Sequence, residues 1–111
     1  MKTLIKNGTL VTAESSFQAD LLIEGEHIIQ IAPSIEAADA EVVDASGQLV
    51  LPGGIDAHVH INLPMGETVS SDDYYTGSKA AAFGGTTTII DFVSQDAGSL
   101  AENTARKRAE A

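Results

Sequence analysis

The sequence contains no cysteine and no tryptophan among its 111 residues, and only six lysines and arginines stand against sixteen aspartates and glutamates. Without cysteine, disulfide bonds and thiolate metal sites are excluded, so any metal ion must be held by nitrogen and oxygen ligands. The formal charge of -10 opposes binding to nucleic acid and to anionic membrane surfaces. We therefore expect neither nucleic acid nor a membrane among the partners.

Long apolar runs are also missing from the sequence. No stretch reaches the roughly 18 apolar residues of a membrane span. The apolar run within the first residues, MKTLIKNGTLV, is too short for the hydrophobic core of a secretion signal. The hydrophobic fraction of 43% and the charged fraction of 20% are typical of a globular domain. These features predict a soluble, cytoplasmic protein.

The first half of the chain, residues 1–51, alternates short β-branched runs with residues that favour turns. Asn7 and Gly8 separate the runs TLI and TLV, Gly25 lies between two apolar runs, and Ser46 begins a similar break. Such pairs between alternating runs favour hairpins. We expect hairpins at these breaks and a small antiparallel sheet.

The pattern changes after Leu51, where Pro52 and two glycines interrupt the apolar run. A rigid residue followed by permissive ones lets a chain leave one structure and enter another. The sequence therefore predicts two domains, 1–51 and 52–111.

The second half predicts two strand and helix pairs. GIDAHVH is typical of a buried strand, and SSDDYYTGSKAAAFGG predicts a helix capped by Ser70 or Ser71. TTTIIDFV predicts a second strand, and SLAENTARKRAEA predicts a helix with a capping box at Ser99 and Glu102. This order is typical of a parallel α/β sheet or barrel, of which the chain contains only the first units.

Two of the three histidines, His58 and His60, lie two positions apart at the end of the first of these strands. Residues i and i+2 of a strand share a face, with Cα atoms about 6.6 Å apart, so both imidazoles can converge on one ion. Two polar residues at a strand end are the simpler interpretation of such a pair taken alone. The position favours a site, because active sites of parallel α/β barrels lie at the C-terminal ends of their strands.

Four other residues near this pair are candidates. Asp56 shares the strand face and either orients an imidazole or bonds the backbone. Asp91, at the end of the second strand, either approaches the centre or has a structural role, and we favour the structural role. Leu63 and Met65 lie in the loop INLPMGETVS, where they either contact substrate or pack on neighbouring barrel residues.

The run PGGIDAHVH, together with SSDDYYTGSKAAAFGGTTTIIDF, resembles the metal-dependent amidohydrolase superfamily and, within it, the dihydropyrimidinase and D-hydantoinase family. The resemblance implies an α/β protein in which a small β-sandwich-type domain precedes a TIM-like (β/α)8 barrel, incomplete in this chain. It also implies two divalent metal ions, usually zinc, bridged by a carboxylated lysine and a hydroxide. His58 and His60 match the first two ligands, and the lysine, two further histidines and a proton-shuttling aspartate are expected downstream.

The resemblance implies hydrolysis of the ring amide of dihydropyrimidines or hydantoins, small cyclic amides and ureides, by a homotetramer. Leu63 and Met65 fall in the loop that gates the substrate in this family, and the 111-residue chain alone is expected to be inactive. The alternatives are a non-catalytic dihydropyrimidinase-related scaffold, another cyclic amidohydrolase such as allantoinase or dihydroorotase, or a small β-module without chemistry. The intact histidine pair favours the catalytic branch.

Overall fold

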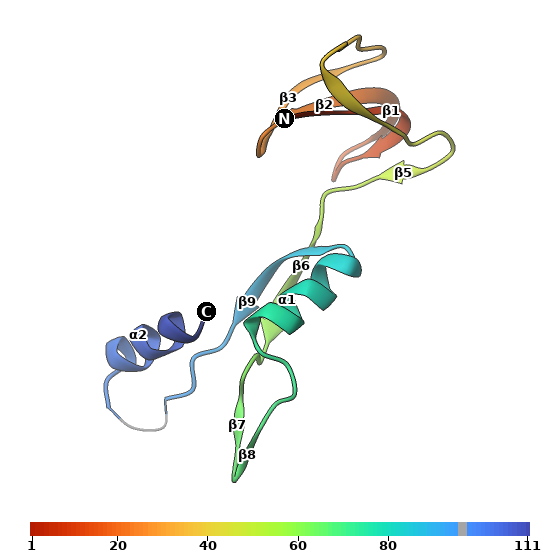
Figure 1. Ribbon diagram of the computed structural model, residues 1–111. Helices are drawn as coiled ribbons and strands as arrows, with labels where there is room; N and C mark the ends of the chain where they lie inside the picture. The colour runs from red at the N-terminus through yellow and green to blue at the C-terminus, as the bar shows by residue number, and fades with distance from the viewer. Residues whose placement is uncertain (96–97) are drawn as a thin grey trace. The chain divides into compact units, whose positions relative to one another are not determined.

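A computed structural model of the chain describes residues 1–95 and 98–111 (Figure 1). They form two compact units, Met1–Pro52 and Gly53–Ala111. Within the described ranges, neither helix has the length and apolar character needed to cross a membrane.

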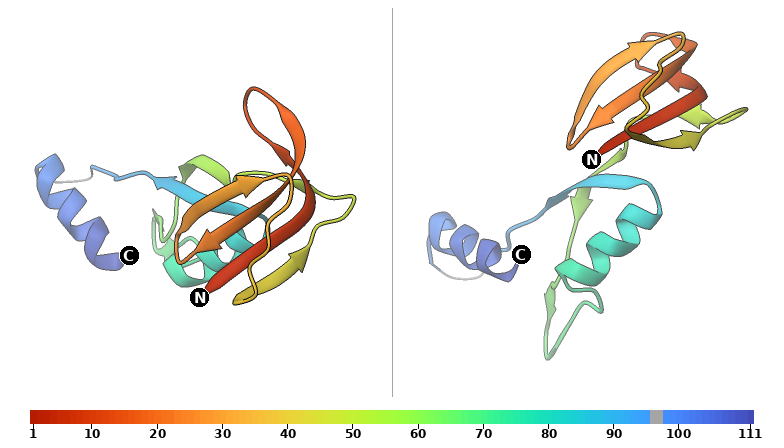
Figure 2. Two further views of the ribbon diagram at one scale, coloured as in Figure 1. Left: turned by 90° about the horizontal axis from the view of Figure 1, so that it is seen from above. Right: turned by 45° about the horizontal axis from the view of Figure 1, so that its top comes forward.

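The first unit is a five-stranded sheet in the order β3-β2-β1-β4, with β5 also paired to β1. Its strands are β1 (Lys2–Val11), β2 (Ser16–Glu24), β3 (His27–Ala32), β4 (Ala40–Asp44) and β5 (Leu49–Val50). The hairpin predicted at Gly25 is confirmed, because β2 and β3 pair antiparallel on either side of it (Figure 2).

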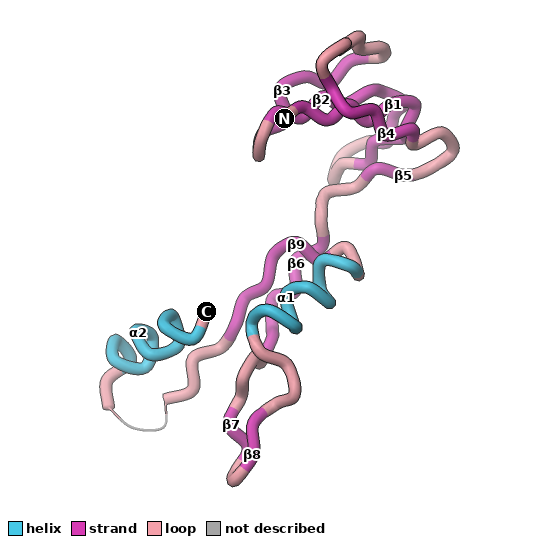
Figure 3. The backbone as a smooth tube through the Cα atoms, viewed as in Figure 1, coloured by secondary structure: helices cyan, strands magenta, loops and turns pink. Residues whose placement is uncertain are grey.

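The sheet is mixed, so the prediction of a wholly antiparallel sheet is wrong in this detail. Both β4 and β5 run parallel to β1, β4 along its first residues and β5 along Thr9 and Leu10 (Figure 3). The break at Ser46 therefore does not fold β5 back on β4. It moves the chain from one part of the edge of β1 to the next.

The prediction of a hairpin at Asn7 and Gly8 is wrong, because β1 continues through both residues without a turn. Asn7 adopts a left-handed backbone with φ of 63°, and the register with β2 shifts between Ile5 and Gly8, which forms a β-bulge. The Asn7 N–H leaves the ladder and donates to the buried Asp20 carboxylate at 2.9 Å. A turn residue pair thus serves here to bend a strand.

The core of this unit lies on both faces of the sheet. Leu4, Leu22 and Ile35 form one buried cluster. Leu10, Ala19 and Leu21 form the other. Adjacent strand residues point to opposite faces, which places Leu21 and Leu22 in different clusters.

The second unit contains the strand, helix, strand and helix that the sequence predicts, so these elements are confirmed. They are β6 (Gly54–Val59), α1 (Tyr74–Phe83), β9 (Thr86–Asp91) and α2 (Leu100–Glu110), with a short hairpin of β7 (Pro64–Met65) and β8 (Thr68–Val69) between β6 and α1. The strands β6 and β9 pair in parallel, as a β/α unit requires.

The helix caps follow local side-chain chemistry. Ser99 and Glu102 form the predicted capping box of α2. The prediction of Ser70 or Ser71 as the cap of α1 is wrong, because the helix starts later, at an Asp73 carboxylate that accepts the Thr76 N–H at 2.8 Å. Ser70 bonds Leu63 instead, through its hydroxyl and its own N–H.

The prediction that GIDAHVH is a buried strand is also wrong for this chain. Ile55 is 67% exposed, and every residue of β6 except Val59 is exposed. The physical reason is that, among the described residues, β6 has a single neighbouring strand, β9. Its apolar side chains therefore lack the neighbours that a continuous sheet would supply.

Candidate metal centre

The two histidines of the HVH run come together at the end of β6. His58 lies in the strand and His60 directly follows its last residue, Val59. The His58 Nε2 and His60 Nε2 atoms are 3.1 Å apart, and the ring centroids are 5.0 Å apart. The rings thus share one side of the strand, as their spacing of two residues predicts.

This nitrogen separation fits joint coordination of one ion. Zinc to nitrogen bonds of about 2.0–2.1 Å would join two atoms at this distance with an angle of about 100° at the ion, close to tetrahedral. The same distance also lets one imidazole donate a hydrogen bond to the other. Across residues 1–95 and 98–111 there is no cluster of three or more histidine, cysteine, aspartate or glutamate side chains suited to a metal. For a tetrahedral ion the pair would therefore supply only two of the four ligands.

Phe92, the first residue after β9, completes a cluster of three rings. Its ring centroid is 4.2 Å from that of His58, with the planes 28° apart, and 5.4 Å from that of His60. The sequence analysis did not single out Phe92. The available signal was its place at the end of the strand that pairs with the histidine strand.

The Asp56 carboxylate accepts a hydrogen bond from the backbone N–H of His58 at 3.1 Å. This is the backbone contact that the sequence analysis weighed against direct orientation of an imidazole. Asp56 therefore bonds the backbone of the strand that carries the histidines, two residues before His58.

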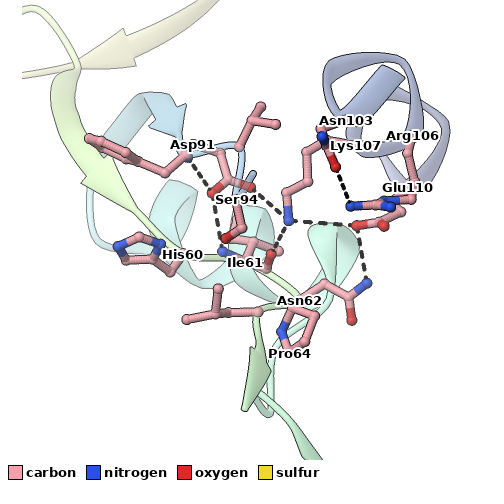
Figure 4. Close-up of a pocket in the computed structure, with 13 residues that line it drawn as sticks. His60, Ile61, Asn62, Pro64, Asp91, Ser94, Asn103, Arg106, Lys107 and Glu110 are labelled. Carbon is pink, nitrogen blue, oxygen red and sulfur yellow. Dashed lines mark hydrogen bonds and ion pairs between the residues drawn. The ribbon is translucent and has the colours of Figure 1, made fainter. Parts of the chain in front are cut away.

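Asp91 is the centre of a polar cluster beside His60 (Figure 4). Its carboxylate accepts hydrogen bonds from the Tyr74 hydroxyl and from the N–H of Phe92, and it pairs with Lys107 at 3.3 Å. It also accepts the N–H of Ile61, the residue after His60, at 3.4 Å, while Lys107 donates to the Ile61 carbonyl.

The charges in this cluster stabilise one another. Burial by itself would raise the pKa of Asp91, but the hydrogen bond from Tyr74 and the contacts of Lys107 outweigh it and hold that pKa below its ordinary value. Burial and the hydrogen bond to Asp91 raise the pKa of Tyr74. Burial would lower the pKa of Lys107, and its bonds to Tyr74 and Asp91 raise it overall. The structural interpretation of Asp91 agrees with these contacts.

Of the two loop candidates, the structure brings one close to the histidines. Leu63 helps line a cavity of about 310 Å³ whose wall also includes His60, Asp91, Phe92 and Lys107. Met65 lies in β7, is 54% exposed and is not part of that wall.

Tyr74 and Lys107 are the other residues that sequence reasoning missed. They lie on α1 and α2, 17 and 16 positions from Asp91, and nothing in the local pattern marks them as its partners.

Comparison with known proteins gives consistent results. The sequence pattern of the amidohydrolase family matches residues 49–110. The chain is 55% identical to D-hydantoinase of Geobacillus stearothermophilus over 92 residues, which cover 83% of this chain and 20% of that protein. It is 52% identical to dihydropyrimidinase of Dictyostelium discoideum over 91 residues, 81% of this chain and 18% of that protein.

The fold is similar as well. The crystal structure of dihydropyrimidinase from Brevibacillus agri superimposes with a TM-score of 0.93 at 51% identity, covering all of this chain and 24% of that one. The α/β class predicted from the sequence is thereby confirmed. The chain spans about a fifth of the length of the curated relatives that it matches.

Proposed function

The chain belongs to the amidohydrolase family, and from this premise we propose that it is part of a cyclic amidohydrolase that opens the ring amide of dihydropyrimidines or hydantoins. The observation that carries the proposal is the convergence of the His58 and His60 Nε2 atoms, 3.1 Å apart, at the end of β6. The relatives named D-hydantoinase and dihydropyrimidinase support the substrate class.

The family is metal-dependent in general, and the histidine pair suits a divalent ion. We propose that His58 and His60 hold zinc within a two-metal centre, with the remaining ligands, including a carboxylated lysine, from parts of the protein outside these 111 residues. When bound, such ions polarise a carbonyl and lower the pKa of water. A proton-shuttling aspartate is proposed outside the chain too.

The residues of this chain orient and shield that centre in the proposal. Asp56 holds the backbone of His58, and the Phe92 ring packs on both imidazoles. Leu63, in the cavity wall beside His60, contacts the substrate ring or its substituent. Met65, in β7 of the same loop, gates access of the substrate, although it is not part of that wall.

The architecture that accompanies this function is proposed from the same family membership. Residues 1–51 belong to a composite sandwich domain, and residues 52–111 begin a (β/α)8 barrel whose strands cover the exposed side chains of β6. The complete protein assembles as a homotetramer and works in the cytoplasm. Light scattering during size-exclusion chromatography measures the assembly.

The test of the function is hydrolysis by the complete protein together with its metal content. Dihydrouracil and hydantoin are the primary substrates, and allantoin and dihydroorotate are tested separately as alternative substrates. His58→Ala and His60→Ala should each abolish hydrolysis and remove bound metal. His27→Ala is the matched control, because His27 is exposed on β3 in the other unit and should leave both unchanged.

The other outcomes separate the alternatives. A folded tetramer that hydrolyses none of the four rings favours the non-catalytic scaffold. Turnover of allantoin or dihydroorotate alone favours a different cyclic amidohydrolase. Full activity in His58→Ala contradicts the proposed centre.

A further inference from the structure

Phe92 is the one side chain whose ring contacts both imidazoles of the candidate centre in the described part of the chain. With His58 it forms a stacked pair, with centroids 4.2 Å apart. With His60 it forms a tilted pair at 5.4 Å. Since the two imidazoles also contact each other at 5.0 Å, each ring in the cluster limits the rotation of the other two.

The backbone of Phe92 is tied to the strand that carries the histidines. Its N–H donates to the Val59 carbonyl at 3.3 Å and to the Asp91 carboxylate at 2.8 Å. Val59 lies between the two histidines and is the cross-strand partner of Asp91. These bonds hold the Phe92 backbone beside the strand that carries both histidines.

The contacts of the Phe92 ring affect how the imidazoles are oriented, and metal coordination depends on that orientation. Histidine χ2 is a broad torsion, so an unrestrained imidazole would turn its Nε2 atom away from an ion as readily as towards it. The ring of Phe92 is stacked on the His58 imidazole and therefore occupies space that this imidazole would need in order to rotate. The observed result is that both Nε2 atoms point to the same place.

We propose that Phe92 is a positioning residue that holds the imidazoles of His58 and His60 in the orientation that binds a divalent cation. The role depends on the proposed metal centre and adds to it a residue that never touches the ion. Aromatic pairs contribute modestly beyond their buried area, so removing the ring should weaken metal binding roughly three- to tenfold.

The experiment compares Phe92→Leu and Phe92→Tyr in the complete protein. Leucine removes the ring and keeps an apolar side chain, whereas tyrosine keeps the ring. Phe83→Leu is the matched control, because Phe83 is 87% exposed in the same unit and makes no ring contact with either histidine. Zinc affinity is measured by competition with a chelator.

A second readout does not need the metal. In the protein stripped of metal, the ring current of Phe92 should shift the imidazole proton resonances of His58 and His60, because its ring centroid lies 4.2 Å and 5.4 Å from theirs. Phe92→Leu should abolish these shifts and weaken zinc binding, while Phe92→Tyr should retain both and Phe83→Leu should change neither. If Phe92→Leu does not fold, Phe92→Met, which nearly conserves volume, takes its place.

Two results would overturn the role of Phe92 while leaving the proposed function intact. One is zinc affinity unchanged in Phe92→Leu, and the other is equal weakening by leucine and tyrosine. A wild-type protein that binds no divalent metal would refute the proposed function and the role of Phe92 together.

Discussion

The Asp91 cluster offers a sharp test of how the end of β6 is held, through the substitution Asp91→Asn. The Asp91 and Lys107 side chains are only 12% and 17% exposed. Asparagine keeps the shape but removes the charge and places an NH₂ group among donors from Tyr74, Lys107 and the backbone. The variant therefore leaves a mostly buried ammonium group without its closest carboxylate.

The expected loss follows from this geometry. Breaking a buried pair by removing one partner costs about 3–5 kcal/mol, and a hydrogen bond to a charged group contributes about 1.5–3 kcal/mol. Lys107 retains Glu110 at 3.6 Å and the Ile61 carbonyl, which offsets part of the cost. We expect Asp91→Asn to lower the free energy of unfolding by about 2–3 kcal/mol.

The contribution of the Asp91 carboxylate to the free energy of unfolding should depend on pH. Because the pKa of Asp91 is lowered by folding, its stabilisation is complete above the unfolded value of about 3.9 and is lost as the pH falls through the folded value. The unfolding free energies of the wild type and Asp91→Asn should therefore differ at pH 7 and converge in acid.

Urea unfolding followed by circular dichroism measures this difference at each pH, and amide hydrogen exchange at Ile61 reports on the local contact. Asp72→Asn is the control, because Asp72 is exposed just before α1 and should change neither quantity. A deficit in Asp91→Asn that persisted undiminished near pH 2, or an unchanged stability at pH 7, would refute the reasoning.

Two further predictions concern the sheet and the isolated chain. Gly8→Ala should destabilise the first unit by about 1–3 kcal/mol in thermal unfolding, because its Cβ would lie 2.6 Å from Val50 Cγ2. The loss should shrink when Val50→Ala is added, and strict additivity of the two changes would contradict the proposed clash. Isothermal titration of the 111-residue chain with Zn²⁺ should show no tight stoichiometric site, and the chain should not hydrolyse dihydrouracil, because two imidazoles supply half of a tetrahedral shell. Tight binding abolished by His58→Ala would show that no other ligands are needed.

Features that depend on neighbours in the sequence were predictable. The capping box of α2 joins Ser99 to Glu102, three residues apart, and the hairpin at Gly25 joins strands on either side of one turn. The approach of the two imidazoles follows from the period of a strand, which places His58 and His60 on one side. Each of these is decided by geometry within a few residues.

The errors in the first sheet arose where a residue with a local preference has a partner far away in the sequence, whereas the misplaced cap of α1 was a choice among nearby residues. Asn7 and Gly8 are typical turn residues, but Asp20 accepts the N–H that the bulge releases, and Val50 packs where a Gly8 side chain would lie. The parallel pairing of β4 and β5 with β1 is likewise a contact across 38 or more positions. No local pattern records which edge a strand will join.

At the candidate centre, too, local sequence and distant contacts determine different features. The amino-acid sequence by itself determined that two imidazoles stand side by side at the end of a strand in a chain without thiols. The tertiary structure decided what surrounds them, because Phe92 reaches both imidazoles across the parallel ladder between β6 and β9. Lys107 reaches Asp91 from α2 only once the chain has folded back. The spacing of the two imidazoles is a property of one strand, whereas their orientation is a property of packing between elements.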